Sequence, residues 1–279
     1  MMSKPNLIFR SVFWFLFAVL VFGFGAGSAQ AQALKLTDGA GENLTVDAED
    51  GIEWHQNDRV FIARGNARAV RGEMTVRADE LRAHYRDGSD SSTDIWRMDA
   101  FGNVVMSSPG QTAHGGNAVY DVERSILVIR PAPGGPPARL STGAEEITAT
   151  GQLEFWSTRN IAVARGQARA VQKNRILSGD VLVAHLVTGK GGDDRVERIE
   201  VYDAVKIETP EDTVTADRGT YQVETGIATL VGSVRMQRGG NSLEGCRAVV
   251  DTRLGVSQLF SCTGADGAAG RVKGQFAPN

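Results

Sequence analysis

The chain has 279 residues and a net charge of −3 at neutral pH, with 7% aromatic residues and two cysteines. The acidic balance and the lack of a basic block argue against nucleic acid as a partner. Neither cysteine has a histidine or a second cysteine at ligand spacing, which argues against a zinc site.

Residues 1–31 have the order of a secretory signal peptide. Lys4 and Arg10 precede an apolar run over 11–27, and small residues then alternate over 28–33 around an Ala-x-Ala cleavage site. A retained membrane anchor is the alternative, because an apolar run of this length can span a bilayer. Cleavage would remove two positive charges and leave a net charge of −5. We therefore expect an exported protein.

From residue 33 onward, apolar and polar residues alternate with a period of two, and no segment has the spacing of a helix. Leu81, Ala83 and Tyr85, for example, share one face of a strand. These runs are punctuated by glycine and asparagine, as at 65–66, 71–73 and 102–103, which read as turns. Short strands with regular turn signals predict an all-β, antiparallel fold: a sandwich, a barrel or an open roll.

An internal repeat is the strongest feature of the sequence. Residues 64–70 (RGNARAV) reappear at 165–171 (RGQARAV), an offset of 101 residues. The same offset aligns Glu53 with Glu154, and Tyr120 with Tyr221, without a gap. Repetition over this length indicates a duplicated domain.

The repeat suggests a division of the chain. We expect a signal peptide at 1–31, a first β domain at 34–130 and a second at 144–263. Residues 131–143 are rich in proline and glycine and are expected to form a linker, because neither residue continues a central strand. Residues 264–279 are expected to form a flexible tail.

The order of these motifs resembles the LptA or OstA-like (organic solvent tolerance-like) family of periplasmic lipopolysaccharide-transport proteins. The segments that carry the resemblance are 60–70, 78–81, 101–104 and 113–121 in the first copy, and 230–234, 243–245 and 249–251 in the second. The resemblance implies an antiparallel β-jellyroll, an open β-roll of OstA-like type, here as two tandem copies stacked end to end.

The resemblance also implies a function and partners. Family members hold the acyl chains of lipopolysaccharide in a groove and form a bridge between the inner and outer membranes. Edge strands would pair by β-augmentation with OstA-like domains of the inner- and outer-membrane transport components, or with further copies of the chain. Shielding acyl chains matters because each exposed methylene costs about 0.8 kcal/mol.

Strand parity suggests which apolar residues line such a groove. The alternative is that the same residues fill a dry core. In the first copy they are Trp54, Val60, Ile62, Met74, Val76, Leu81, Val104 and Met106; in the second they are Phe155, Ile161, Val163, Leu177, Leu182, Val205 and Ile207.

Other functions are less well supported by the residues. An envelope scaffold or assembly protein with the same fold, carrying no lipid, is the main alternative. A carbohydrate-binding module or a polysaccharide-acting enzyme is a weaker one, because aromatic platforms are scarce. No catalytic constellation, metal site or cofactor motif is found; His84 and His185 occupy equivalent positions on a polar strand face. Cys246 and Cys262 are expected to form a disulfide in an oxidising compartment, with two buried thiols as the alternative.

Overall fold

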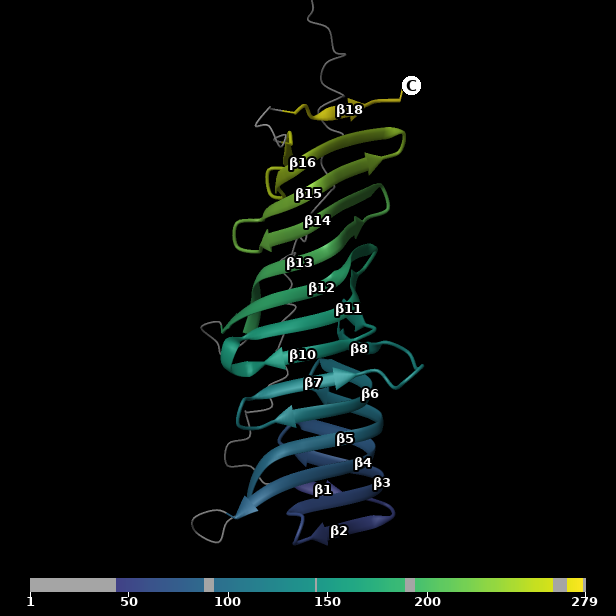
Figure 1. Cartoon of the computed structure of the whole chain (residues 1–279), viewed down its shortest axis with the longest axis vertical. Coiled ribbons are helices and arrows are strands. Elements are labelled where there is room, and N and C mark those ends of the chain that lie inside the picture. Colours follow the sequence, from purple (N-terminus) through teal and green to yellow (C-terminus); the bar gives the residue numbers. More distant parts are fainter. Residues whose placement is uncertain (1–43, 88–92, 144, 189–193, 263–269, 278–279) are drawn as a thin grey trace, which may run out of the picture. The chain divides into compact units, whose positions relative to one another are not determined.

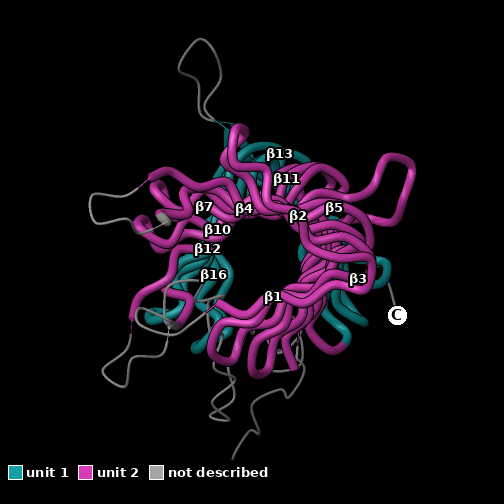
Figure 2. The backbone as a smooth tube through the Cα atoms, turned by 90° about the horizontal axis from the view of Figure 1, so that it is seen from below, with its two compact units in different colours: residues 1–28, 174–178, 198–279 teal, residues 29–173, 179–197 magenta. Residues whose placement is uncertain are grey.

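A computed structural model describes residues 44–87, 93–143, 145–188, 194–262 and 270–277 (Figure 1). The predicted signal peptide lies outside the described residues. Contacts divide the chain into two compact units (Figure 2). Residues 29–173 and 179–197 belong to unit 2, and residues 174–178 and 198–279 to unit 1, as far as they are described.

Unit 2 is a curved antiparallel sheet (Figure 2) in which β2 to β7 pair in chain order. Other pairings skip along the chain: β1 with β3, β6 with β8, β7 with β10 and β9 with β11. Its elements are β1 (Thr45–Asp47), β2 (Gly51–His55), β3 (Val60–Arg71), β4 (Met74–Asp87), β5 (Thr93–Ser108), β6 (Gln111–Asp121), β7 (Ile126–Arg130), β8 (Ala138–Thr142), β9 (Glu145–Ala149), β10 (Gln152–Trp156), the 3-10 turn η2 (Ser157–Arg159) and β11 (Ile161–Gln172). β12 (Arg175–Thr188) and β13 (Asp194–Glu208) contribute residues to both units.

Unit 1 repeats this pattern of antiparallel neighbours. Its further strands are β14 (Asp212–Gln222), β15 (Ile227–Arg238), β16 (Asn241–Asp251), β17 (Val256–Phe260) and β18 (Lys273–Gln275). The predicted all-β, antiparallel jellyroll is thus confirmed.

The units of packing do not coincide with the sequence repeats. β10 and β11 begin the second repeat but belong to unit 2 with the first. The segment expected as a linker contains β8, which pairs with both β6 and β9. The segment expected as a flexible tail contains the short strand β18, which pairs with β16.

Glycine pairs expected to form turns lie instead inside long strands. β3 runs through Gly65-Asn66 and β5 through Gly102-Asn103, and the register with the neighbouring strand shifts at each pair. Both residues of each pair have positive φ, 78° and 43° in β3 and 72° and 47° in β5. Two consecutive left-handed residues make a bulge that bends a strand without ending it. The expectation of a turn at these positions is therefore wrong, whereas the turn at 72–73 is present.

The bends in neighbouring strands are held together by polar contacts. The amide of Asn103 donates to both carboxylate oxygens of Asp79, at 3.1 and 3.0 Å. A Cβ atom at Gly102 would collide with the same carboxylate, so only glycine fits there. Asp217 approaches Gly232 in the same way in the second repeat. Immediately after the bends, Ala67 and Val104 are almost fully buried.

The two repeats differ in the surroundings of their first strands. β10 pairs with β11 on one side and with β7 on the other. Its counterpart β2 pairs with β3, and no second partner lies within the described ranges. Ile52 and Trp54 on β2 are accordingly 52% and 58% exposed, whereas Leu153 on β10 is 9% exposed. Within the described residues, unit 2 therefore ends in an open sheet edge at β1 and β2.

Candidate functional site

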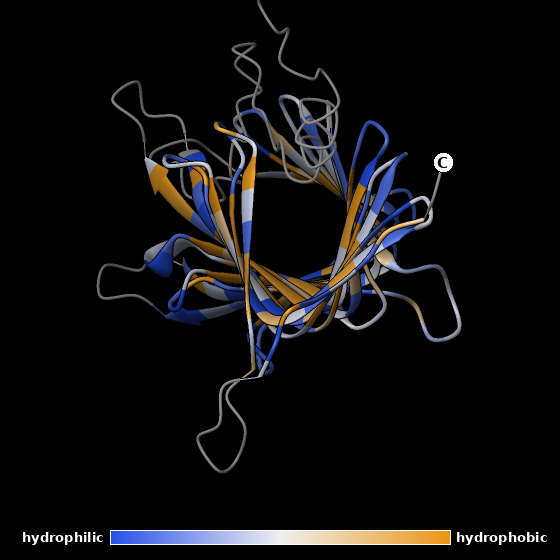
Figure 3. Ribbon diagram, turned by 90° about the horizontal axis from the view of Figure 1, so that it is seen from above, coloured by the Kyte–Doolittle hydropathy of each residue, from blue (hydrophilic) through white to orange (hydrophobic). Residues whose placement is uncertain are grey.

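The inner face of unit 2 can be followed from strand to strand through the register, because directly opposed residues share a face. Phe61 lies opposite Ala83, and Ala83 lies opposite Met98 on the next strand. Met98 is followed by Tyr120, and Tyr120 by Leu127. These five residues form a continuous apolar row across β3 to β7. Figure 3 shows the same alternation of apolar and polar residues along the strands.

This face encloses a groove with about 280 Å³ of free volume. The polar residues of its lining are Arg71, Arg82 and Asp99. Arg82 and Asp99 are next to the inward-facing Ala83 and Met98 in their strands, so that their side chains project from the opposite face of the sheet. The apolar lining residues are Leu44, Val46, Ile52, Phe61, Ala63, Ala69, Met74, Val76, Leu81, Ala83, Ile95, Met98, Ala100, Met106, Ala118, Tyr120 and Leu127. Such a groove can accept an extended apolar ligand.

Several residues chosen from the sequence lie on inner faces. Met74, Val76, Leu81 and Met106 line the groove of unit 2. Val104 lies two residues before Met106 and is 1% exposed. In unit 1, Leu177, Val205 and Ile207 line a hollow of only about 20 Å³. Leu182, in the part of β12 that belongs to unit 2, is buried.

Four of the residues chosen as inward-facing lie on the opposite face of the sheet. Val60 pairs with His84 and Ile62 with Arg82; in the second repeat Ile161 pairs with Trp156 and Val163 with Glu154. These positions are opposite in parity to Phe61 and Leu127. Long polar side chains on the same face cover these apolar residues, which leaves Ile62 7% and Val163 5% exposed. Their side chains therefore do not face the groove.

The two aromatic residues chosen on β2 and β10 have the inner parity but different surroundings. Phe155 lies opposite Leu127. Trp54 stacks on Phe61 with ring centroids 5.4 Å apart, and its indole N–H donates to the Tyr85 hydroxyl at 2.7 Å. Trp54 thus extends the inner row to the open edge.

Sequence reasoning missed the centre of the groove. Phe61, Met98, Tyr120 and Leu127 line it and were not chosen. The alternation of Leu81, Ala83 and Tyr85 indicates correctly that these three residues share one face of β4. To predict that Phe61 rather than Val60 shares this face, one must know which residues of β3 lie opposite those of β4. Alternation within one strand does not give that register.

The outer face carries a ladder of ion pairs. Arg64 contacts both Glu53 and Glu80, and Glu80 also accepts from Arg82. Burial raises the pKa of Glu80, but hydrogen bonds from Arg82 and Arg64 outweigh it, so that the pKa lies below its usual range. The Arg82 guanidinium also lies 5.0 Å from the Phe101 ring centre. The outer face is therefore charged, whereas the inner face is apolar and forms the groove.

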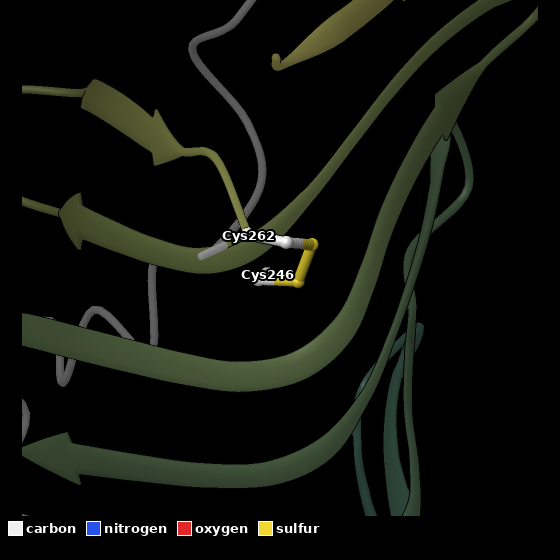
Figure 4. The surroundings of a disulfide bond; sticks show 2 residues. All are labelled: Cys246 and Cys262. Carbon is white, nitrogen blue, oxygen red and sulfur yellow. A yellow bond between two sulfur atoms is a disulfide. The ribbon is translucent and has the colours of Figure 1, made fainter. Parts of the chain in front are cut away.

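Cys246 and Cys262 are joined by a disulfide in unit 1 (Figure 4). Their Cα atoms are 4.9 Å apart, and 16 residues separate them in the chain. Cys246 lies in β16 and Cys262 follows β17, so that the bond fastens the end of β17 to its neighbour.

Within the described residues, no three or more His, Cys, Asp or Glu side chains are grouped so as to hold a metal ion. No helix in that part of the chain is long and apolar enough to cross a membrane.

An antiparallel jellyroll with an apolar groove along its inner face defines a class of proteins whose groove can accept an apolar ligand. Comparison with protein families places the chain within that class. The family described as "LptA/(LptD N-terminal domain) LPS transport protein" matches residues 45–132 and 146–256. The chain belongs to this family of lipopolysaccharide (LPS) transport proteins.

One solved structure illustrates the likeness. LptH of Pseudomonas aeruginosa, described as the LptA homologous periplasmic component of the conserved lipopolysaccharide transport device, is 20% identical to this chain. The alignment covers 48% of this chain and 95% of LptH, with a TM-score of 0.39. No curated protein sequence matches the chain.

Proposed function

We propose that the groove of unit 2 binds the acyl chains of lipopolysaccharide in the periplasm, as part of a jellyroll bridge between the inner and outer membranes. The observation that carries the proposal is the apolar row from Phe61 to Leu127, which lines about 280 Å³ of free volume. Each methylene removed from water there contributes about 0.8 kcal/mol. The family supports lipopolysaccharide as the source of those methylenes.

The bridge requires domains to join end to end, and the chain contains a template for such a joint. β7 pairs with β10 through Ile129–Leu153 and Leu127–Phe155, which continues the inner face of one repeat into the next. The open edge at β2 presents Ile52 and Trp54, the counterparts of Leu153 and Phe155. A strand from a related domain, or from a second copy of the chain, would cover them in the same way.

Site-specific photocrosslinking tests lipid binding. A photoreactive phenylalanine analogue replaces Phe61, which lines the groove, or Phe101, which lies on the outer face and is 38% exposed. Both changes keep an aromatic ring, so that the pair is matched in size. We expect lipopolysaccharide adducts at Phe61 and none at Phe101 when cells are irradiated.

The opposite result would favour an envelope scaffold that carries no lipid. If a folded and exported protein gave no adduct at Phe61, or equal adducts at both positions, the groove would not be a lipid site. Circular dichroism of each purified variant separates this outcome from misfolding.

A further inference from the structure

A row of polar side chains borders the groove on the same inner face. The register places Arg71 opposite Met74, and Gln111 opposite both Ser108 and Thr142. Arg71 and Met74 line the groove. Gln111 is two residues from Ala113, which lies opposite the groove residue Met106. Because side chains two apart in a strand point the same way, Gln111 faces inward beside the groove.

Gln111 is an unusual residue for this position. It is 6% exposed and lies on the inner face with an uncharged amide. Its counterpart in the second repeat, Asp212, is 4% exposed and is held by two hydrogen bonds of 2.5 Å from Arg238. In the second repeat, the side chain at this position is thus bound by an arginine of the same chain. The first repeat leaves a buried amide that can donate and accept.

The row continues on β9 and β11. Glu145 lies opposite Gln172, whose side-chain amide donates to the Glu145 carboxylate at 2.7 Å. The Glu145 backbone N–H donates to the Thr142 hydroxyl at 3.2 Å. Burial raises the pKa of Glu145, although the hydrogen bond from Gln172 opposes the shift. This cluster therefore offers hydrogen-bond donors and acceptors beside the groove.

We propose that Arg71, Gln111, Thr142, Glu145 and Gln172 form a polar subsite that binds the phosphorylated sugar headgroup of the amphiphile whose acyl chains occupy the groove. This inference rests on the proposed function. Arg71 pairs with a phosphate through its guanidinium, and the amide and carboxyl groups bind sugar hydroxyls. The subsite fixes which end of the lipid lies at the rim, and so gives an otherwise apolar groove an orientation.

Equilibrium binding of two probes to the purified mature chain tests the subsite. The probes are lipopolysaccharide, which has the headgroup, and a fluorescent long-chain fatty acid, which has neither sugar nor phosphate. Gln111→Leu and Arg71→Met should each weaken lipopolysaccharide binding about tenfold, as expected when one strong hydrogen-bonded contact is lost. Fatty-acid binding should stay unchanged in both variants.

The matched control is Arg77→Met, which removes an exposed arginine of β4 that lies opposite Arg68 and faces away from the groove. It should alter neither affinity. Unchanged lipopolysaccharide affinity in both test variants would overturn the subsite and leave the proposed function standing, as would equal weakening of both probes. A wild-type chain that binds neither probe would overturn the proposed function itself, and the subsite with it. Thermal unfolding of each variant confirms that the fold is intact.

Discussion

Glu154 and its counterpart in the first repeat are the same residue type in different surroundings. Its side chain is 5% exposed and accepts hydrogen bonds from Arg165, Gln152 and Trp156. Burial raises the pKa of Glu154, but these three donors outweigh it and hold the pKa below the ordinary value of 4.5. Glu53, at the equivalent position beside the open edge, has a side chain that is 51% exposed.

Replacing Glu154 by glutamine should destabilise the protein in a pH-dependent way. At pH 7 we expect a loss of about 1–2 kcal/mol, because the buried donors lose a charged acceptor. A lowered pKa in the folded state stabilises the protein above the ordinary glutamate pKa, and this contribution disappears as the pH falls through the folded value. Thermal melts of Glu154→Gln and wild type should therefore differ at pH 7 and converge once the pH falls below the folded-state pKa of Glu154, which itself lies below 4.5.

Glu53→Gln provides the control for this comparison. The change is chemically identical at the same position of the repeat, but the side chain is exposed, so that melts at the two pH values should show little effect. A difference between Glu154→Gln and wild type that stayed constant with pH would mean that the carboxylate charge is not the stabilising feature.

At the scale of a strand, the bend in β5 depends on the close approach of Gly102 to Asp79. Gly102 and Gly110 have nearly the same φ, +72° and +74°, but a Cβ atom would meet Asp79 at Gly102 and nothing at Gly110. Gly110→Ala should cost about 1 kcal/mol, from backbone conformation alone. Gly102→Ala adds a clash and should cost about 2–4 kcal/mol in total. Chemical denaturation of the two variants measures the difference; equal losses would show that the bend tolerates a side chain.

These bends also explain what could and could not be predicted from the sequence. Alternation over 81–85 identified strands and one polar face correctly, because the period of two is local. Gly65-Asn66 was interpreted as a turn, because a left-handed pair has the same composition in a turn as in a bulge. Across the bulge in β3 the groove-lining residues keep one parity, as Phe61 and Ala69 show. In β4 the parity changes between Val76 and Leu81, where no glycine marks the shift. Alternation along single strands therefore assigned the inner face correctly to Met74 and Met106 and incorrectly to Val60 and Ile62.

For the molecule as a whole, the open edge at β2 is where assembly can be tested. Ile52→Lys places an inward-pointing charge on an edge strand, a feature that opposes pairing between sheets. If the chain joins related domains through this edge, wild type should associate with rising concentration in sedimentation velocity, and Ile52→Lys should remain monomeric. Ile52 is 52% exposed, so that the folded monomer should retain its stability.

Leu254→Lys is the control for a general effect of added charge. Leu254 is 68% exposed in the turn between β16 and β17, away from β2 in the sequence and in unit 1. Its replacement should leave association through β2 unchanged. A wild-type protein that stayed monomeric at high concentration, and bound no related domain, would contradict end-to-end joining.

The pairing of β7 with β10 lowers the free-energy cost of association in any assembly built from this chain. Two separate domains meeting at such a joint must pay for lost translational and rotational freedom, whereas strands on one polypeptide meet at an effective concentration set by the intervening residues. Residues 131–151 connect β7 to β10 and themselves form β8 and β9, so that they bring the two strands together as the chain folds. This joint neither dissociates on dilution nor requires a partner to arrive, and a span of given length has fewer places at which it can come apart.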